Sequence, residues 1–376
     1  MRVLAAAISA SLSAAAPLPT VTPVAPDTSL AAPLPLHVGG RVVATAEGLK
    51  RQWPGSYFEA AFRGRSAVMK VGTGEATLHV LVDGRTVATL VKPRPGLYRI
   101  GDLASGTHRV RVEVASESQA APTLFGGFFA ADALPAPTRS RRIEFVGDSH
   151  TVGYGNISPK RDCTEAEVSA TTDTSRGIAG IVGRRYDADY RVNAISGRGV
   201  VRNYDGFAAD TLPVAYPHAL FDKTDTADDR GWHPQLYVVA LGTNDFSTPL
   251  KAGEKWHDRA ALHADFEATY AAFLRSLRAR DPAAHVLVWA TDMADGEIAA
   301  EARNTVERLR AAGMKDIAFV PAKGLAFSGC HAHPSVADDE RIARLVAAYI
   351  DAHPDLWRRG AIKGSGDPRA AARTDR

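Results

Sequence analysis

The chain has 376 residues, 45% of them hydrophobic and 23% charged, with a formal net charge of +3. This composition is typical of a soluble globular protein with room for two domains. The charge is small for this length and no basic stripe is interleaved with aromatic residues, which excludes the usual nucleic-acid binders. Beyond the amino terminus no apolar run approaches membrane-spanning length. Neither nucleic acid nor a membrane is therefore an expected partner, and the oligomeric state is left open.

The first 33 residues precede any globular pattern. Residues 1–16 combine a single basic residue, Arg2, with a short apolar run and an alanine-rich exit, which is typical of a signal peptide. We therefore expect a secreted or periplasmic protein, with Pro17 blurring the cleavage position. Residues 17–33 are rich in proline and predict a flexible leader.

Residues 34–134 predict an all-β domain. Short alternating runs are separated by turn residues, and Asp83-Gly84 is a hairpin signal between two of them. Strands at this spacing indicate a β-sandwich that ends near Phe129, followed by a linker at 134–138. The expected strands lie at 40–45, 56–62, 67–71, 76–82, 86–91 and 108–114.

From residue 141 to residue 360 the pattern alternates between strand and helix. Such alternation predicts a parallel sheet with helices on both faces. Residues 361–376 predict a disordered tail. The expected strands lie at 143–146, 190–195, 235–241, 285–290 and 316–320. The expected helices lie at 172–186, 259–280, 297–312 and 336–352.

A serine follows the first of these strands. The run 143–146 ends in Gly147-Asp148-Ser149, and further glycines follow at Gly153 and Gly155. The carboxyl edge of a parallel sheet is where α/β proteins collect their chemistry. Ser149 is therefore a candidate nucleophile whose backbone N–H points toward an incoming carbonyl oxygen. Taken alone, Ser149 fits a turn serine that caps the next helix better than it fits a nucleophile.

Two further strand ends carry candidate oxyanion donors. Gly197, in Gly197-Arg198-Gly199, follows the strand at 190–195, and a glycine there lets backbone N–H groups approach a ligand. Asn244 follows the strand at 235–241 and can donate its side-chain N–H to an oxyanion. Each has a plain alternative: a tight turn for Gly197 and a helix cap for Asn244.

A histidine loop precedes the last expected helix. His333 lies in Gly329-Cys330-His331-Ala332-His333-Pro334, and from such a loop it can reach the top of the sheet as a general base. His331 and His333 alternate as metal ligands do. No Cys, Asp or Glu cluster completes a site, so no metal is expected.

The chain has two cysteines, Cys163 and Cys330, each close to one of these motifs. Two free buried thiols are one interpretation. In an exported protein an oxidising compartment favours a disulfide between them. That bond would close a long loop and contribute roughly 5 kcal/mol in the chain-entropy model.

In chain order, these motifs are similar to the blocks of the SGNH/GDSL hydrolase superfamily. More closely, the chain resembles carbohydrate esterase family 2, which joins an amino-terminal jelly-roll β-sandwich to an SGNH domain. The similarity covers almost the whole mature chain. The matching stretches lie at 147–155, 196–204, 241–245 and 329–335.

The resemblance implies removal of O-acetyl groups from polysaccharides or oligosaccharides of the xylan or mannan type, with no cofactor. Ser149 would attack the acetyl carbonyl, and His333 would take the serine proton and return it to the sugar hydroxyl. The Ser149 N–H, the Gly197 N–H and the Asn244 side chain would hold the oxyanion. The supporting residues of these motifs are Asp148 and Asp245.

The chain departs from the family pattern beside the histidine. Many members carry an acidic residue two positions before it, where this chain has His331. Either a backbone carbonyl or another carboxylate then orients His333, and Asp338 and Asp339 follow on the next helix. Ala332 replaces a common aromatic residue, which implies a differently shaped acceptor site.

His150 is a further departure, since the family usually has an aliphatic residue there, and we interpret it as a packing variant. Two other functions stay open. One is a carbohydrate-binding protein with a degenerate catalytic domain. The other is a GDSL lipase or thioesterase, which would need an apolar acyl groove. The sandwich itself either binds glycan or only buttresses the catalytic domain.

Overall fold

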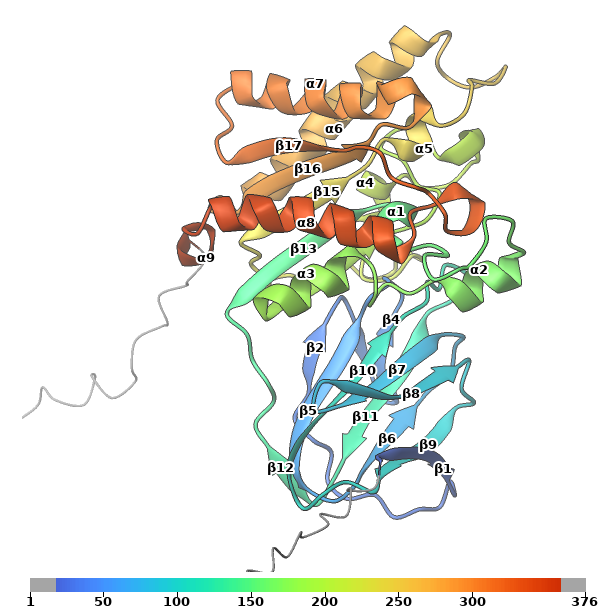
Figure 1. Cartoon of the computed structure of the whole chain (residues 1–376), viewed down its shortest axis with the longest axis vertical. Coiled ribbons are helices and arrows are strands. Elements are labelled where there is room, and N and C mark those ends of the chain that lie inside the picture. Colours follow the sequence, from blue (N-terminus) through green and yellow to red (C-terminus); the bar gives the residue numbers. More distant parts are fainter. Residues whose placement is uncertain (1–17, 360–376) are drawn as a thin grey trace, which may run out of the picture.

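The computed structural model describes residues 18–359, so the expected signal peptide and the tail at 361–376 lie outside the described residues. An all-β region comes first and an α/β region with a parallel sheet follows, which confirms the predicted fold class. Figure 1 shows the α/β region stacked on one end of the sandwich. Within residues 18–359, no helix combines the length and apolarity needed to cross a bilayer.

The amino-terminal region is a sandwich of two antiparallel sheets. One sheet has the order β1-β9-β6-β11-β4-β3, and the other has the order β12-β5-β10-β7-β8, with β2 also paired to β5. Buried and half-buried residues alternate along β7 because successive side chains point to opposite faces. The strands are β1 (Thr20–Val24), β2 (His37–Gly39), β3 (Val43–Thr45), β4 (Gly48–Arg51), β5 (Tyr57–Gly64), β6 (Ala67–Val71), β7 (Thr77–Val82), β8 (Arg85–Val91), β9 (Gly96–Gly101), β10 (Gly106–Val114), β11 (Thr123–Phe129) and β12 (Asp132–Leu134).

The expected flexible leader at 17–33 was wrong for the described part. Thr20–Val24 forms strand β1 and pairs antiparallel with β9. Val21, Val24 and the threonines favour an extended chain, and Pro23 is compatible because β1 is the edge strand of its sheet. Further along, Leu34 N–H donates to Phe128 O at 2.8 Å, so this end of the segment is also held to the sandwich.

The second region is built on a five-stranded parallel sheet of order β14-β13-β15-β16-β17. The expected strands are present, with ends displaced by at most two residues. Every residue of β15 and β16 is buried, which fits a sheet covered on both faces. The strands are β13 (Arg141–Gly147), β14 (Ala188–Ala194), β15 (Leu236–Ala240), β16 (His285–Thr291) and β17 (Ile317–Ala322).

The helices expected at 259–280, 297–312 and 336–352 agree with the observed ones to within one residue, but the helix expected at 172–186 is wrong in its first half. The chain turns after α2, where the Asp173 carboxylate accepts N–H bonds from Ser175 and Arg176, and α3 begins only after Gly177. The helices are α1 (Ser149–Val152), α2 (Glu165–Thr171), α3 (Ile178–Tyr186), α4 (Leu212–Ala215), α5 (Thr243–Phe246), α6 (Arg259–Arg280), α7 (Glu297–Ala311), α8 (Val336–Ala352) and α9 (Leu356–Arg359), with 3-10 turns η1 (Tyr204–Gly206), η2 (Ala294–Gly296) and η3 (Cys330–Ala332).

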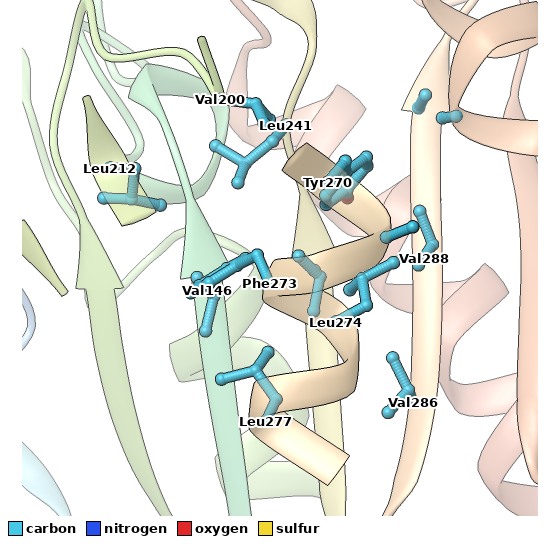
Figure 2. Close-up of a cluster of buried hydrophobic side chains, with 14 of the residues drawn as sticks. Val146, Val200, Leu212, Leu241, Tyr270, Phe273, Leu274, Leu277, Val286 and Val288 are labelled. Atoms are coloured by element: carbon cyan, nitrogen blue, oxygen red, sulfur yellow. The ribbon is translucent and has the colours of Figure 1, made fainter. Parts of the chain in front are cut away.

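Two apolar cores hold the helices against the parallel sheet. Side chains of α6 and α7 cover one face, and side chains of α3 and α8 cover the other. Figure 2 shows the first core, where Leu274 and Leu277 of α6 face Val146 of β13 and Val288 of β16. This packing fixes the strands whose carboxyl ends carry the candidate site.

The sandwich is joined to the α/β region by buried side chains. The side chains of Trp53 and Tyr57, from the sandwich, are fully buried in the two cores of the α/β region. Trp53 Nε1 donates to His218 O at 3.0 Å, and Tyr57 Oη donates to the Asp189 carboxylate at 2.9 Å. Arg139, next to the expected linker, forms an ion pair with Glu59 of the sandwich. The two regions therefore share their interior.

Candidate active site

The three candidate loops follow three adjacent strands of the parallel sheet. Ser149 is the first residue of α1 after β13, Gly197 follows β14, and Asn244 lies on α5 after β15. Since β13 lies between β14 and β15, the serine turn lies between the two candidate oxyanion donors. As the first residue of its helix, Ser149 has a backbone N–H with no acceptor inside the helix.

Ser149 is hydrogen-bonded to His333. His333 Nε2 lies 2.8 Å from Ser149 Oγ, although the two residues are far apart in sequence. His333 lies between the short turn η3 and the start of α8, and Ser149 is almost completely buried. This is the distance required for a general base to take the serine proton.

Backbone carbonyls orient the imidazole of His333. Its Nδ1 lies 3.0 Å from Cys330 O and 3.3 Å from His331 O. A carbonyl can only accept, so Nδ1 carries the ring proton and Nε2 is left free to accept from Ser149. Of the two alternatives that the sequence leaves open, the structure shows the carbonyl arrangement.

The two aspartates of α8 are engaged elsewhere. The Asp338 carboxylate accepts N–H bonds from Ala326 and Phe327, and Asp339 accepts from Asn156 Nδ2 at 2.9 Å.

Burial lowers the pKa of His333 to about 4, because the carbonyls compensate only part of the cost of desolvating an imidazolium. His333 is therefore neutral, and able to act as a base, from weakly acidic pH upward.

Two rings pack against the imidazole of His333. Tyr154 lies over it with ring centroids 4.4 Å apart, and His150 meets it edge-on at 5.5 Å. Burial lowers the pKa of His150 to about 3, so this second histidine is neutral in the folded protein. The packing of Tyr154 on His333 was not predicted, because a tyrosine between two glycines does not show which ring it will contact.

A disulfide holds the turn that carries His333. Cys163 and Cys330 are bonded with an S–S distance of 2.06 Å, joining the segment after α1 to η3. His331 and Ala332 have φ values of 51° and 57°, in the left-handed region that costs non-glycine residues energy. The Nε2 atom of the His331 ring lies 2.7 Å from Cys163 O, and the backbone N–H of His331 donates to Arg161 O.

Asn244 connects the three loops. Its Nδ2 donates to Arg198 O at 2.9 Å and to the Asp148 carboxylate at 3.3 Å. Asp148 also caps α1 by accepting the His150 N–H at 3.0 Å. Burial raises the pKa of Asp148 to about 7. The amide is thus fixed between the serine turn and the loop of Gly197.

Asp245 shapes the loop that follows Gly197. Its carboxylate accepts the backbone N–H groups of Val200, Val201 and Arg202, at 2.9–3.1 Å. Burial raises its pKa to about 6, against the lowering effect of these bonds. Gly197 has a φ of 82°, which only glycine adopts without strain.

Family models match both regions of the chain. The model of the carbohydrate esterase 2 N-terminal domain matches residues 38–137, and the model of the GDSL-like lipase/acylhydrolase family matches residues 145–355. A curated protein of Cellvibrio japonicus, described as an acetylxylan esterase and glucomannan deacetylase, is 39% identical over 334 residues. That match covers 86% of this chain and 93% of the relative.

The chain belongs to carbohydrate esterase family 2. A solved carbohydrate esterase, described for divergent catalytic and non-catalytic binding functions of its active site, has a TM-score of 0.82 at 37% identity and covers 87% of this chain and 100% of its own. A family 2 esterase from Clostridium thermocellum, solved with cellohexaose, has a TM-score of 0.75 at 26% identity over 85% of this chain and 99% of its own. The predicted family is confirmed, and the protein is a carbohydrate acetyl esterase.

Proposed function

We propose that this esterase removes O-acetyl groups from xylan- or mannan-type polysaccharides or oligosaccharides by a Ser149–His333 mechanism. The observation that carries the proposal is the 2.8 Å contact between Ser149 Oγ and His333 Nε2, with Nδ1 committed to backbone carbonyls. That arrangement leaves one nitrogen basic and aims it at one hydroxyl. The binding-protein alternative gives no reason for this contact.

In the first half of the reaction, Ser149 Oγ attacks the acetyl carbonyl carbon while its proton passes to His333 Nε2. The carbonyl oxygen becomes an oxyanion, stabilised by the N–H groups of Ser149 and Gly197 and by Asn244 Nδ2. Asn244 makes this bond by exchanging the longer of its two bonds, the one to Asp148 at 3.3 Å, for the oxyanion. When the tetrahedral species collapses, the sugar oxygen leaves and takes the proton from His333. The products are the deacetylated hydroxyl and an acetyl-enzyme.

In the second half, His333 takes a proton from water as the water oxygen attacks the acetyl-enzyme. The second tetrahedral species expels Ser149 Oγ, which recovers its proton from His333, and acetic acid is released. Asp148 and Asp245 act as positioning residues, since one caps the helix of Ser149 and the other folds the loop after Gly197.

Two exposed aromatic residues support a carbohydrate acceptor. Phe207 lies beside Gly197, where a Cβ atom on the glycine would come within 3.2 Å of its ring, and Tyr204 N–H donates to Gly197 O. Both rings are about half exposed. Half-exposed aromatic rings beside the loop of Gly197 offer a sugar ring a flat face to pack against. The C. japonicus relative is named for acetylxylan and glucomannan, so we propose this substrate class here.

We also propose that the protein is secreted or periplasmic. The signal-like first 16 residues support this location. So does the Cys163–Cys330 disulfide, because such bonds persist in oxidising compartments.

The test is acetate release from acetylated xylan and acetylated glucomannan by wild type and by Ser149→Ala. We expect release by wild type and a loss of at least about 1,000-fold in the variant. A nitrophenyl ester series of increasing acyl length should be hydrolysed best as the acetate. Best activity on long chains would favour the lipase alternative. Glycan binding without any release would favour the binding protein.

A further inference from the structure

The segment that follows β10 of the sandwich contacts the loop after β14, which carries Gly197. Two residues of this segment, Glu117 and Gln119, are hydrogen-bonded to Ser196, the residue before Gly197. We propose that these two residues position the Gly197 N–H for catalysis, so that the sandwich contributes directly to transition-state stabilisation. This inference rests on the proposed role of Gly197 in the oxyanion hole.

The first contact is made to the peptide group between Ser196 and Gly197, which carries the proposed oxyanion donor. Gln119 Nε2 donates to Ser196 O at 3.1 Å. Ser196 O and the Gly197 N–H belong to the same planar peptide group, so fixing one end fixes the direction of the other. A donor at the carbonyl end also polarises the peptide and makes its N–H a stronger donor.

The second contact holds the preceding peptide. Glu117 Oε1 accepts the Ser196 N–H at 2.9 Å and also accepts from Gln119 Nε2 at 3.1 Å. An ionised carboxylate only accepts, so it turns the NH₂ group of Gln119 toward itself and Ser196. Glu117 thus sets both the position of Ser196 and the orientation of the amide that binds its carbonyl.

The segment that carries these residues is itself fixed. Thr77 N–H donates to Ser116 Oγ at 2.8 Å, and Ser118 Oγ donates to Glu75 O at 3.0 Å. Gln52 Nε2 donates to Gln119 O at 2.9 Å. A support held at three points can hold the oxyanion peptide in one orientation before substrate arrives, which is the condition for electrostatic preorganisation.

The charge of Glu117 is balanced locally. Burial raises the pKa of its carboxyl, and the bonds from Ser196 and the neighbouring Arg198 guanidinium oppose that rise. A free carboxylate near the oxyanion would work against catalysis. Because Glu117 is committed to two N–H donors and lies near Arg198, it can serve as a support.

Gln119→Glu and Gln119→Met test the proposal in the full-length protein. Both keep the length of the side chain and remove the donor to Ser196 O, and Glu also repels the carbonyl. Since removing an oxyanion donor outright costs about 100- to 1,000-fold in kcat, we expect misorienting one to cost about 10- to 100-fold, most in Gln119→Glu. The KM and the melting temperature should stay close to wild type, because Gln119 is exposed.

Thr86→Ala is the matched control, an exposed polar residue on β8 of the same sandwich. It should leave kcat unchanged. A boronic acid that forms a tetrahedral adduct on Ser149 should lose affinity in Gln119→Glu in parallel with kcat/KM. An unchanged kcat in both Gln119 variants would overturn the proposal, and so would a loss that follows the melting temperature without weaker boronate binding. An inactive wild type would instead reject the proposed function itself.

Discussion

The two sides of the reacting centre are held by different means. On the base side, a disulfide and backbone carbonyls fix a turn with two left-handed residues, and no acidic side chain among residues 18–359 is bonded to His333. On the oxyanion side, hydrogen bonds donated to the buried carboxyl groups of Asp245 and Asp148 fix the loops of Gly197 and Asn244. In this molecule a base without a carboxylate partner is oriented by a disulfide that holds its turn, whereas the oxyanion donors are oriented by the polar side chains around them.

Replacing Asn244, the side-chain donor of the oxyanion site, should lower kcat more than the other variants of this section. In Asn244→Ala, kcat on an acetyl ester should fall by about 100- to 1,000-fold with little change in KM, because the donor acts on the developing oxyanion. Steady-state kinetics checks this. Asn304→Ala, at an exposed position of α7, is the control and should match wild type. A full kcat in Asn244→Ala would remove Asn244 from the mechanism.

Breaking the disulfide tests the base side. In Cys163→Ser/Cys330→Ser, we expect the free energy of unfolding to fall by about 2–5 kcal/mol, measured by urea denaturation. The kcat of the folded variant should fall as well, because Cys330 O no longer stays aligned with His333 Nδ1. Added reductant should lower the activity of wild type and have no effect on the double variant. Full activity in the double variant would show that the carbonyls need no covalent brace.

His331→Asp tests the base side by placing an acid two residues before His333. His333 has a lowered pKa of about 4, so the acid limb of kcat/KM in wild type should fall near that pH. In His331→Asp, a carboxylate beside the ring stabilises imidazolium and should raise the pKa of His333 by about 1–3 units. The neutral base is then lost at higher pH, and the limb moves upward. His331→Asn tolerates the same left-handed backbone without the charge and should leave the limb in place.

The smallest effect is expected at His150. His150→Leu should leave kcat close to wild type, whereas loss of a general base would lower it about 100-fold or more. The variant should also change the pH dependence of stability. The pKa of His150 is lowered to about 3 in the folded state, so unfolded chains bind its proton first as pH falls below about 6.5. Melting temperatures from pH 7 to pH 4 should therefore fall less steeply in His150→Leu.

The sequence predicted the parallel sheet because each of its strands is a buried run between turns. It placed Ser149, Gly197 and Asn244 after three such strands, and adjacency in the sheet then brings their loops to one edge. Strand β1 was missed because prolines around it hide an edge strand whose stability comes from pairing with β9. The helix predicted at 172–186 began too early, because the Asp173 carboxylate accepts the Ser175 N–H and holds a turn before α3. The spacing of apolar residues does not reveal such a bond.

The orientation of His333 was left open for a physical reason. Its partners are main-chain carbonyls, presented by a turn in which His331 and Ala332 adopt positive φ. No side-chain type marks such a carbonyl. The contribution of Glu117 and Gln119 was equally hidden, because they lie in the sandwich and meet Ser196 only through the packing of the two regions.

The most direct test of the account is a search for the acetyl-enzyme. Wild type is mixed with an acetyl ester, quenched rapidly in acid, digested and mapped by mass spectrometry. We expect one acetyl group on the peptide that contains Ser149, absent in Ser149→Ala and accumulating as acetate release begins. Turnover by wild type with acetyl found on another residue, or steady release by Ser149→Ala, would contradict the Ser149–His333 mechanism.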